Sequence, residues 1–188
     1  MASAESRGAI DWLAAASPDP ESCRWQWERG PTRVALLPAG VRWDVVAVPT
    51  HLGRIALDLL FGASAGTGPG AVLLPGPAQH GASPDPSPGP VLTGARRKRV
   101  GFFVPVGTAD TWVGTDTRCL GRGGWIPVPH PTRPLPPSEA VHAPAWLVAP
   151  DGSGQLNDPI LLDLVLHEAA ARVAEIRASG VRDFGGGA

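Results

Sequence analysis

The segment 42–49, Arg-Trp-Asp-Val-Val-Ala-Val-Pro, constrains the fold more than any other part of the chain. Its unbroken run of valine and alanine, ended by a proline, is typical of a buried strand. A second apolar run, 33–37, precedes it, and Pro38-Ala39-Gly40 separates the two. We therefore expect residues 33–48 to form a buried β-hairpin.

Four helices are expected, three in the first third of the chain and one near its C-terminal end. Apolar residues recur every three or four positions in 4–16, 51–61 and 158–180, which is the spacing of an amphipathic helix. Asp19 and Pro20 provide a typical start for another helix at 20–28. The C-terminal pattern is the clearest, because it opens at Asp158 and stops at Gly180.

Short apolar runs fill the middle of the chain. They predict strands at 91–95, 100–105, 125–128 and 146–149, with a short helix at 108–113. Helices first, strands through the middle and a helix last predict an α+β fold, with a mainly antiparallel central sheet flanked by helices.

The length of 188 residues suits one domain with a real core. We assign residues 1–157 to this domain and expect helix 158–180 to pack on it, followed by a disordered tail at 181–188. Within the domain, residues 62–90 are rich in Gly, Pro, Ser and Ala. Such a composition buries too little apolar surface to offset its ordering entropy, so a flexible insertion is expected there.

Composition bounds the function only loosely. The net charge of -1 gives no global reason to bind nucleic acid, so any basic surface must be local. Cys23 and Cys119 are too few for a disulfide framework, and the N-terminal region lacks a long apolar run. We therefore expect a cytoplasmic protein with no membrane association. The abundance of Ala, Gly, Pro and Arg and the lack of Tyr indicate a GC-rich bacterial genome.

Four landmarks occur in a recognisable order. They are Asp44 on its strand, Thr93-Gly94, Phe102-Phe103, and the segment from Gly121 to Pro129. In this order they resemble the bifunctional DNA primase/polymerase N-terminal domain, a branch of the archaeo-eukaryotic primase superfamily. The resemblance covers roughly residues 8–150. It implies a primase/polymerase-like fold and a nucleotidyltransferase of DNA replication that uses Mg²⁺ or Mn²⁺ and nucleoside triphosphates.

The catalytic positions that this resemblance implies are largely missing. A two-metal site needs neighbouring carboxylates on one strand face, yet the partner position of Asp44 is Val46. The family histidine would fall at Val100 or Gly101. Asp44 is therefore the single candidate catalytic and metal-binding residue, and we expect a pseudoenzyme with weak or no catalysis. Alternatively, Asp44 makes a structural hydrogen bond, for example with Arg42 or Arg54.

A third alternative is an active enzyme whose second acid comes from elsewhere in the chain. The candidates for that acid are Asp58, Asp110 and Asp116. The five histidines and the tryptophans offer no comparable site: the histidines lack a zinc-type spacing, and Trp12, Trp25, Trp43 and Trp146 lie in or beside apolar faces. Core packing is expected for these four tryptophans.

The run Arg96, Arg97, Lys98 and Arg99 is the main candidate for binding. It is either a solvated hairpin turn or a phosphate clamp for single-stranded DNA or a nucleoside triphosphate. Thr93, before the turn, and Arg122, in the glycine-rich turn 121–124, complete the expected set of phosphate contacts. The competing hypothesis is a non-enzymatic protein-interaction or regulatory module, which would use the N-terminal or C-terminal helices.

Overall fold

The computed structural model describes residues 4–64, 87–114, 116–134 and 142–182. The fold is α+β, as predicted, with a five-stranded sheet in the order β5-β2-β4-β3-β7 and a two-stranded ribbon, β1-β6. All strand pairs are antiparallel. The strands are β1 (Val34–Pro38), β2 (Asp44–Pro49), β3 (Val91–Thr93), β4 (Arg99–Val104), β5 (Arg118–Leu120), β6 (Trp125–Pro129) and β7 (Ala145–Val148).

Five α-helices accompany the strands in the described part of the chain. They are α1 (Ala4–Ala14), α2 (Pro20–Arg29), α3 (Thr50–Ser64), α4 (Thr108–Thr111) and α6 (Pro159–Arg182). The predicted helix starts are confirmed by their caps: the Asp19 side chain accepts a hydrogen bond from the Ser22 amide, and the Asp158 side chain accepts from Ile160 and Leu161. Such caps satisfy backbone donors that the first turn leaves free.

The predicted hairpin at 33–48 is wrong. β1 pairs with β6, from Val34 opposite Pro129 to Pro38 opposite Trp125, whereas β2 pairs with β4 and β5 in the other sheet. Between them Gly40 adopts a φ of 78°, and the chain changes sheets there. The prolines of β1 and β6 lack amide donors, so this ribbon cannot extend a sheet on every side. β2 is buried along both faces and needs two neighbours, which distant strands supply.

The predicted strands at 91–95 and 100–105 are confirmed as the hairpin β3–β4, with Thr93 opposite Val100. Only the ends of segment 62–90 fall among the described residues. Helix α3 continues to Ser64, and the Pro90 carbonyl accepts hydrogen bonds from the Phe103 amide and the buried Asn157 side chain. Residues 65–86, which hold most of the predicted insertion, lie outside the described residues.

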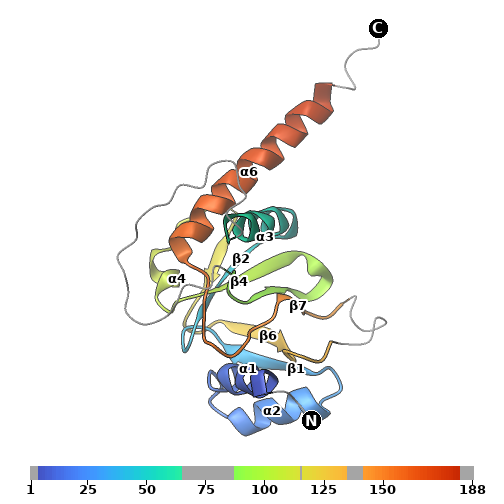
Figure 1. Cartoon of the computed structure of the whole chain (residues 1–188), viewed down its shortest axis with the longest axis vertical. Helices are drawn as coiled ribbons and strands as arrows, with labels where there is room; N and C mark the ends of the chain where they lie inside the picture. The colour runs from blue at the N-terminus through green and yellow to red at the C-terminus, as the bar shows by residue number, and fades with distance from the viewer. Residues whose placement is uncertain (1–3, 65–86, 115, 135–141, 183–188) are drawn as a thin grey trace.

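The five-stranded sheet is covered on both faces (Figure 1). One face packs against α3 and α6 through an apolar cluster that includes Val46, Val48 and Phe102. The other face packs against the ribbon and helices α1 and α2 through Trp43, Val45 and Phe103, among others. The two clusters alternate along β2 because successive side chains of a strand point to opposite faces.

Helix α6 packs on the body along only part of its length. Leu162, Val165, Leu166 and Ala169 are buried against α3 and the sheet. Its C-terminal half extends past the other elements, as Figure 1 shows. Among the described residues, no helix is both long enough and apolar enough to cross a membrane.

Candidate functional site

Asp44 begins the central strand β2 and is 1% exposed. Its Oδ2 atom accepts hydrogen bonds from the backbone amides of Gly107, at 3.0 Å, and Ala109, at 2.9 Å. These amides belong to the first turn of the short helix α4, where backbone donors have no helical partner. The Asp44 carboxylate therefore anchors α4 to the sheet, and neither Arg42 nor Arg54 is its hydrogen-bond partner.

The strand face that carries Asp44 is closed. Val46, two residues on, is fully buried among residues of α3 and α6. Cys119 of β5 lies opposite Val46, and burial, reinforced by the negative charge of Asp44, raises the pKa of its thiol to about 12. A metal ion at positions 44 and 46 would thus have to enter the core between the sheet and these helices.

The Asp44 Oδ1 atom is buried and has no hydrogen-bond partner. A Cβ atom added to Gly121 would lie 3.4 Å from it and 2.5 Å from the Ala109 side chain, so the β5–β6 turn is packed closely over the carboxylate. No group of three or more His, Cys, Asp or Glu side chains that could hold a metal ion occurs among the described residues. The arrangement around Asp44 is that of a structural hydrogen bond.

The position at which the resemblance to primase/polymerase domains would place a histidine has no room for one. Val100 is fully buried in the cluster beneath α3. Gly101 lies on the other face of β4, where an added Cβ atom would approach the Val45 side chain to 2.9 Å. A side chain at 101 would collide with the central strand, so packing accounts for this glycine.

The glycine-rich turn 121–124 also has a packing role. Gly123 adopts a φ of 87°, and the Gly124 amide donates to the Gly121 carbonyl across the turn. A Cβ atom on Gly40 would meet the Arg122 backbone at 2.4 Å. Arg122 is therefore fixed beside the β1–β2 loop, next to the Asp44 end of β2, and its side chain is exposed.

Thr93 is buried, and its hydroxyl bridges the amide and carbonyl of Ala145 on β7. Its polar atom is thus used inside the sheet. The basic residues that follow are different, because Arg96, Arg97, Lys98 and Arg99 are all exposed. Arg96, Arg97 and Lys98 lie in the turn between β3 and β4, which includes a short 3-10 segment, and Arg99 begins β4.

The basic turn is held by backbone hydrogen bonds to its neighbours. The Gly94 amide donates to the Arg99 carbonyl, and the Thr50 amide, at the start of α3, donates to the Lys98 carbonyl. The Thr50 hydroxyl donates to the Arg97 carbonyl. Arg96 and Arg97 adopt φ values of 61° and 50°, a left-handed conformation that costs a non-glycine residue about 1 kcal/mol or more.

Arg99 and a further cation, Arg118, lie on the two strands that flank β2. Arg99 is opposite Pro49, and its guanidinium group lies 3.4 Å from the Ala47 carbonyl of β2. Arg118, an exposed residue of β5, is opposite the same Ala47 from the other side. We call Arg96, Arg97, Lys98, Arg99 and Arg118 the cationic end of the sheet. None of them forms an ion pair with an acid in the part of the chain that the structure describes.

The predicted phosphate contacts do not converge on one place. The cationic end lies where β2 finishes, at Pro49, whereas Arg122 lies near Asp44, where β2 begins. Six residues of strand span about 17 Å. Arg118, which the sequence did not single out, joins the turn through the pairing of β5 with β2, a contact that no local pattern reveals.

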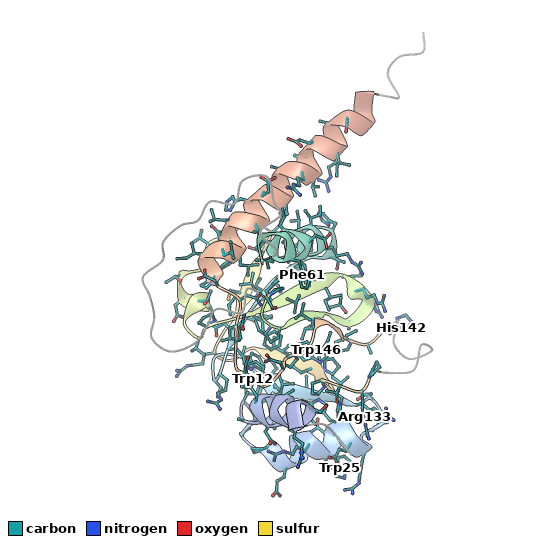
Figure 2. The ribbon with its side chains drawn as sticks, viewed as in Figure 1. Trp12, Trp25, Phe61, Arg133, His142 and Trp146 are labelled. Atoms are coloured by element: carbon teal, nitrogen blue, oxygen red, sulfur yellow. The ribbon has the colours of Figure 1, made fainter. Side chains whose placement is uncertain are left out.

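The tryptophans divide between core and surface. Trp43 and Trp27 are fully buried, and the Trp43 ring lies 4.6 Å from that of Phe103. Trp12 and Trp146 pack partly against the same cluster. Trp25 is 53% exposed at the outer side of α2 (Figure 2), so the expected core role of Trp25 is wrong.

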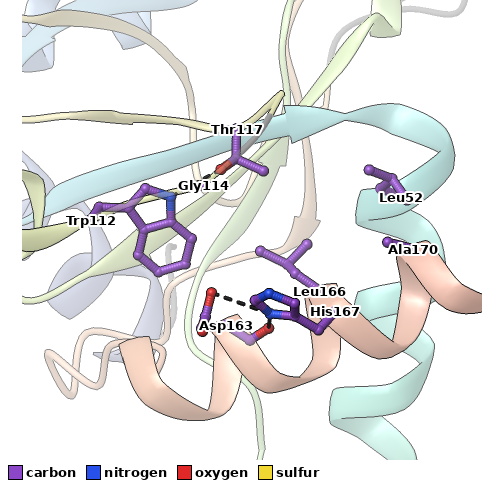
Figure 3. A pocket seen from close by; sticks show the side chains of 8 residues that line it. All are labelled: Leu52, Trp112, Gly114, Thr117, Asp163, Leu166, His167 and Ala170. Atoms are coloured by element: carbon purple, nitrogen blue, oxygen red, sulfur yellow. Dashed lines mark hydrogen bonds and ion pairs between the residues drawn. The ribbon is translucent and has the colours of Figure 1, made fainter.

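An open pocket of about 220 Å³ lies between α6 and the loop after α4. Figure 3 shows the Trp112 ring, Asp163 and His167 around this space. The Trp112 indole donates to the Thr117 hydroxyl. His167 lies 3.5 Å from the carboxylate of Asp163, four residues earlier on α6.

Comparisons with family models, with curated proteins and with solved structures found no match to this chain.

Proposed function

We propose that this chain is a diverged primase/polymerase-like domain that binds the phosphate backbone of single-stranded nucleic acid without catalysing nucleotidyl transfer. The observation that carries the proposal is the cationic end of the sheet, where five exposed cations from two separate segments lack acidic partners among the described residues. Unpaired cations keep their full attraction for phosphate, whereas paired ones must first lose a partner.

The spacing of these cations favours a chain of phosphates over a single nucleotide. Arg99 on β4 and Arg118 on β5 are separated by β2 and offset by two residues along it, so their backbones are about 12 Å apart. The remaining three lie along the turn beyond β4. Cations spread over the end of the sheet in this way match successive phosphates of a single-stranded nucleic acid. They do not surround one triphosphate.

The backbone of the turn supports the same proposal. Two consecutive arginines in the left-handed conformation cost stability that glycine or asparagine would not. Strained backbone of this kind is found preferentially at functional sites. The hydrogen bonds from Thr50 hold the turn in place, so the backbone that carries its cations is fixed before any ligand binds.

The state of Asp44 supports the lack of catalysis. A two-metal mechanism requires open carboxylates, and both oxygens of Asp44 are enclosed: Oδ2 by two amides, and Oδ1 against Gly121. In this proposal the domain needs no metal cofactor, and Mg²⁺ or Mn²⁺ would matter only if catalysis were retained.

The proposal is tested by fluorescence anisotropy with a labelled single-stranded oligonucleotide over a salt series. One variant changes Arg96, Arg97, Lys98 and Arg99 to Ala. A matched control changes Arg7, Arg29, Arg42 and Arg133 to Ala, which removes the same charge from α1, α2, the β1–β2 loop and the segment after β6. Each phosphate contact on a single strand contributes about −0.7 to the slope of log K against log salt.

We expect the turn variant to bind much more weakly and to flatten this slope by up to about 3. The control should keep both affinity and slope near those of the wild type. Equal losses in the two variants would show that net charge alone governs binding and would contradict the proposal. Binding or nucleotide incorporation that depends on Mn²⁺ and is lost in Asp44→Asn would instead indicate an active enzyme with Asp44 in its metal site.

A further inference from the structure

Helix α6 carries a second apolar stripe that faces away from the body. The stripe consists of residues at alternating spacings of four and three, and all six are exposed: Ile160, Leu164, His167, Ala171, Ala174 and Ala178. At 3.6 residues per turn this stripe lies on the side of the helix opposite the buried residues Leu162, Val165 and Ala169. Ile160 is 74% exposed and Leu164 is 53% exposed.

The stripe changes character along the helix. Its N-terminal half carries large residues, and its C-terminal half carries only alanines. Large side chains pack closely when they meet small ones. An antiparallel copy of the same helix provides this match, because it places Ile160 against Ala178, Leu164 against Ala174, and His167 against Ala171 of the second copy.

Opposite charges along one edge of the stripe fit the same pairing. Asp163 and Arg177 lie on one edge, because each directly precedes a residue of the stripe, Leu164 and Ala178 respectively. In the antiparallel arrangement Asp163 therefore meets Arg177 of the second copy, and the reverse pair forms by symmetry.

Arg177 has no ion-pair partner among the described residues, and Asp163 lines the pocket beside Trp112. An arginine that reaches Asp163 from the second copy would lie against the Trp112 ring, an arrangement that adds a cation–π contact. The pocket in Figure 3 then receives the guanidinium group of the partner helix.

From this match of shape and charge we propose that the chain forms a homodimer through antiparallel pairing of α6 helices, centred near residue 169. The contact runs from residue 160 to residue 178, about 27 Å of helix. It lies opposite the face that packs on α3, so the two bodies flank the helix pair. The cationic end is not part of the interface.

The first test is the mass of the full-length chain by light scattering across a concentration series. The wild type should approach twice the chain mass of 19.4 kDa. Ala174→Glu places a charge on the stripe, against Leu164 of the second copy. This variant should be a monomer with an unchanged circular dichroism spectrum. The matched control, Ile176→Glu, adds the same charge on the other side of α6 and should remain dimeric.

The charges give a second test. Arg177→Asp should weaken dimerisation by about tenfold, because it places two repulsive pairs in the interface. Adding Asp163→Arg exchanges the two signs and should restore the wild-type dissociation constant. A double variant that is no tighter than the single variant would contradict the pairing of these residues.

Orientation is tested by crosslinking with a bismaleimide. Ile160→Cys combined with Ala178→Cys should give a covalent dimer, whereas Ala178→Cys alone should not, because the two copies of residue 178 lie at opposite ends. A crosslink in the single variant would show a parallel pair and overturn the proposal. A wild-type protein that stays monomeric at every concentration would also overturn it.

Discussion

The Asp44 carboxylate accepts a hydrogen bond of 2.9 Å from the Ala109 amide. The acid that the sequence singled out for catalysis thus joins the central strand to the helix that follows β4. The same oxygen accepts a second bond, from Gly107. Such charge-assisted bonds at a helix N-terminus contribute stability, since they satisfy donors that the helix leaves free.

We expect Asp44→Ala to lower the free energy of unfolding by about 2 kcal/mol, because it leaves two partly buried amides without an acceptor. Asp44→Asn keeps one oxygen acceptor and should cost less. Urea denaturation measures both. EDTA or added Mn²⁺ should leave the wild-type curve unchanged, and a metal-dependent shift that disappears in Asp44→Asn would indicate a bound ion.

Arg96→Gly should raise the free energy of unfolding by about 0.5–1 kcal/mol, because glycine adopts the left-handed conformation of residue 96 without strain. The same variant should bind the oligonucleotide more weakly, since it removes a cation. Lys98→Gly is the control: Lys98 has a φ of -81°, so this change removes an equal charge without relieving strain and should not stabilise the protein.

Both cysteines should react slowly in the native protein. Burial is the main cause that raises the pKa of Cys23 to about 11 and that of Cys119 to about 12. At pH 8 about one thiol in a thousand or fewer is then a thiolate, the reactive form. Labelling with Ellman's reagent should be rapid only after unfolding in urea, and two thiols that react at once under native conditions would contradict this environment.

Stability should fall as the pH drops below about 6.5 because of His130. Burial, followed by the nearby charges of Arg133 and Arg33, lowers the pKa of this histidine from 6.5 in the folded state. Its Nδ1 atom accepts hydrogen bonds from the Thr132 and Arg133 amides, so protonation removes that acceptor.

The sign follows from linkage: between the folded and the unfolded pKa the unfolded state binds more protons, so lower pH favours unfolding. This contribution is fully present above the unfolded pKa and is lost as the pH falls through the folded value. His130→Asn keeps an acceptor near Nδ1 and should unfold with a smaller pH dependence between pH 7.5 and 5.5 in urea titrations. An unchanged pH dependence would show that other groups dominate.

Local chemistry in the sequence determined most of the elements. The cap residues Asp19 and Asp158, the three-and-four spacing in α6 and the apolar runs of β3 and β4 each act over a few neighbouring residues, so they can be recognised without knowledge of the fold. The α+β class follows from their order. Strand periodicity alone also identified position 46 as the partner position of Asp44, and the sequence has a valine there instead of an acid.

Only the tertiary structure decided how these elements pair. β1 looked like the partner of β2 because the two are adjacent in sequence, yet it pairs with β6, more than eighty residues away. The partner amides of Asp44, the role of Thr93 inside the sheet and the position of Arg118 beside the basic turn are also long-range contacts. Pairing depends on which distant surfaces bury the most apolar area together, and that quantity is a property of the whole chain.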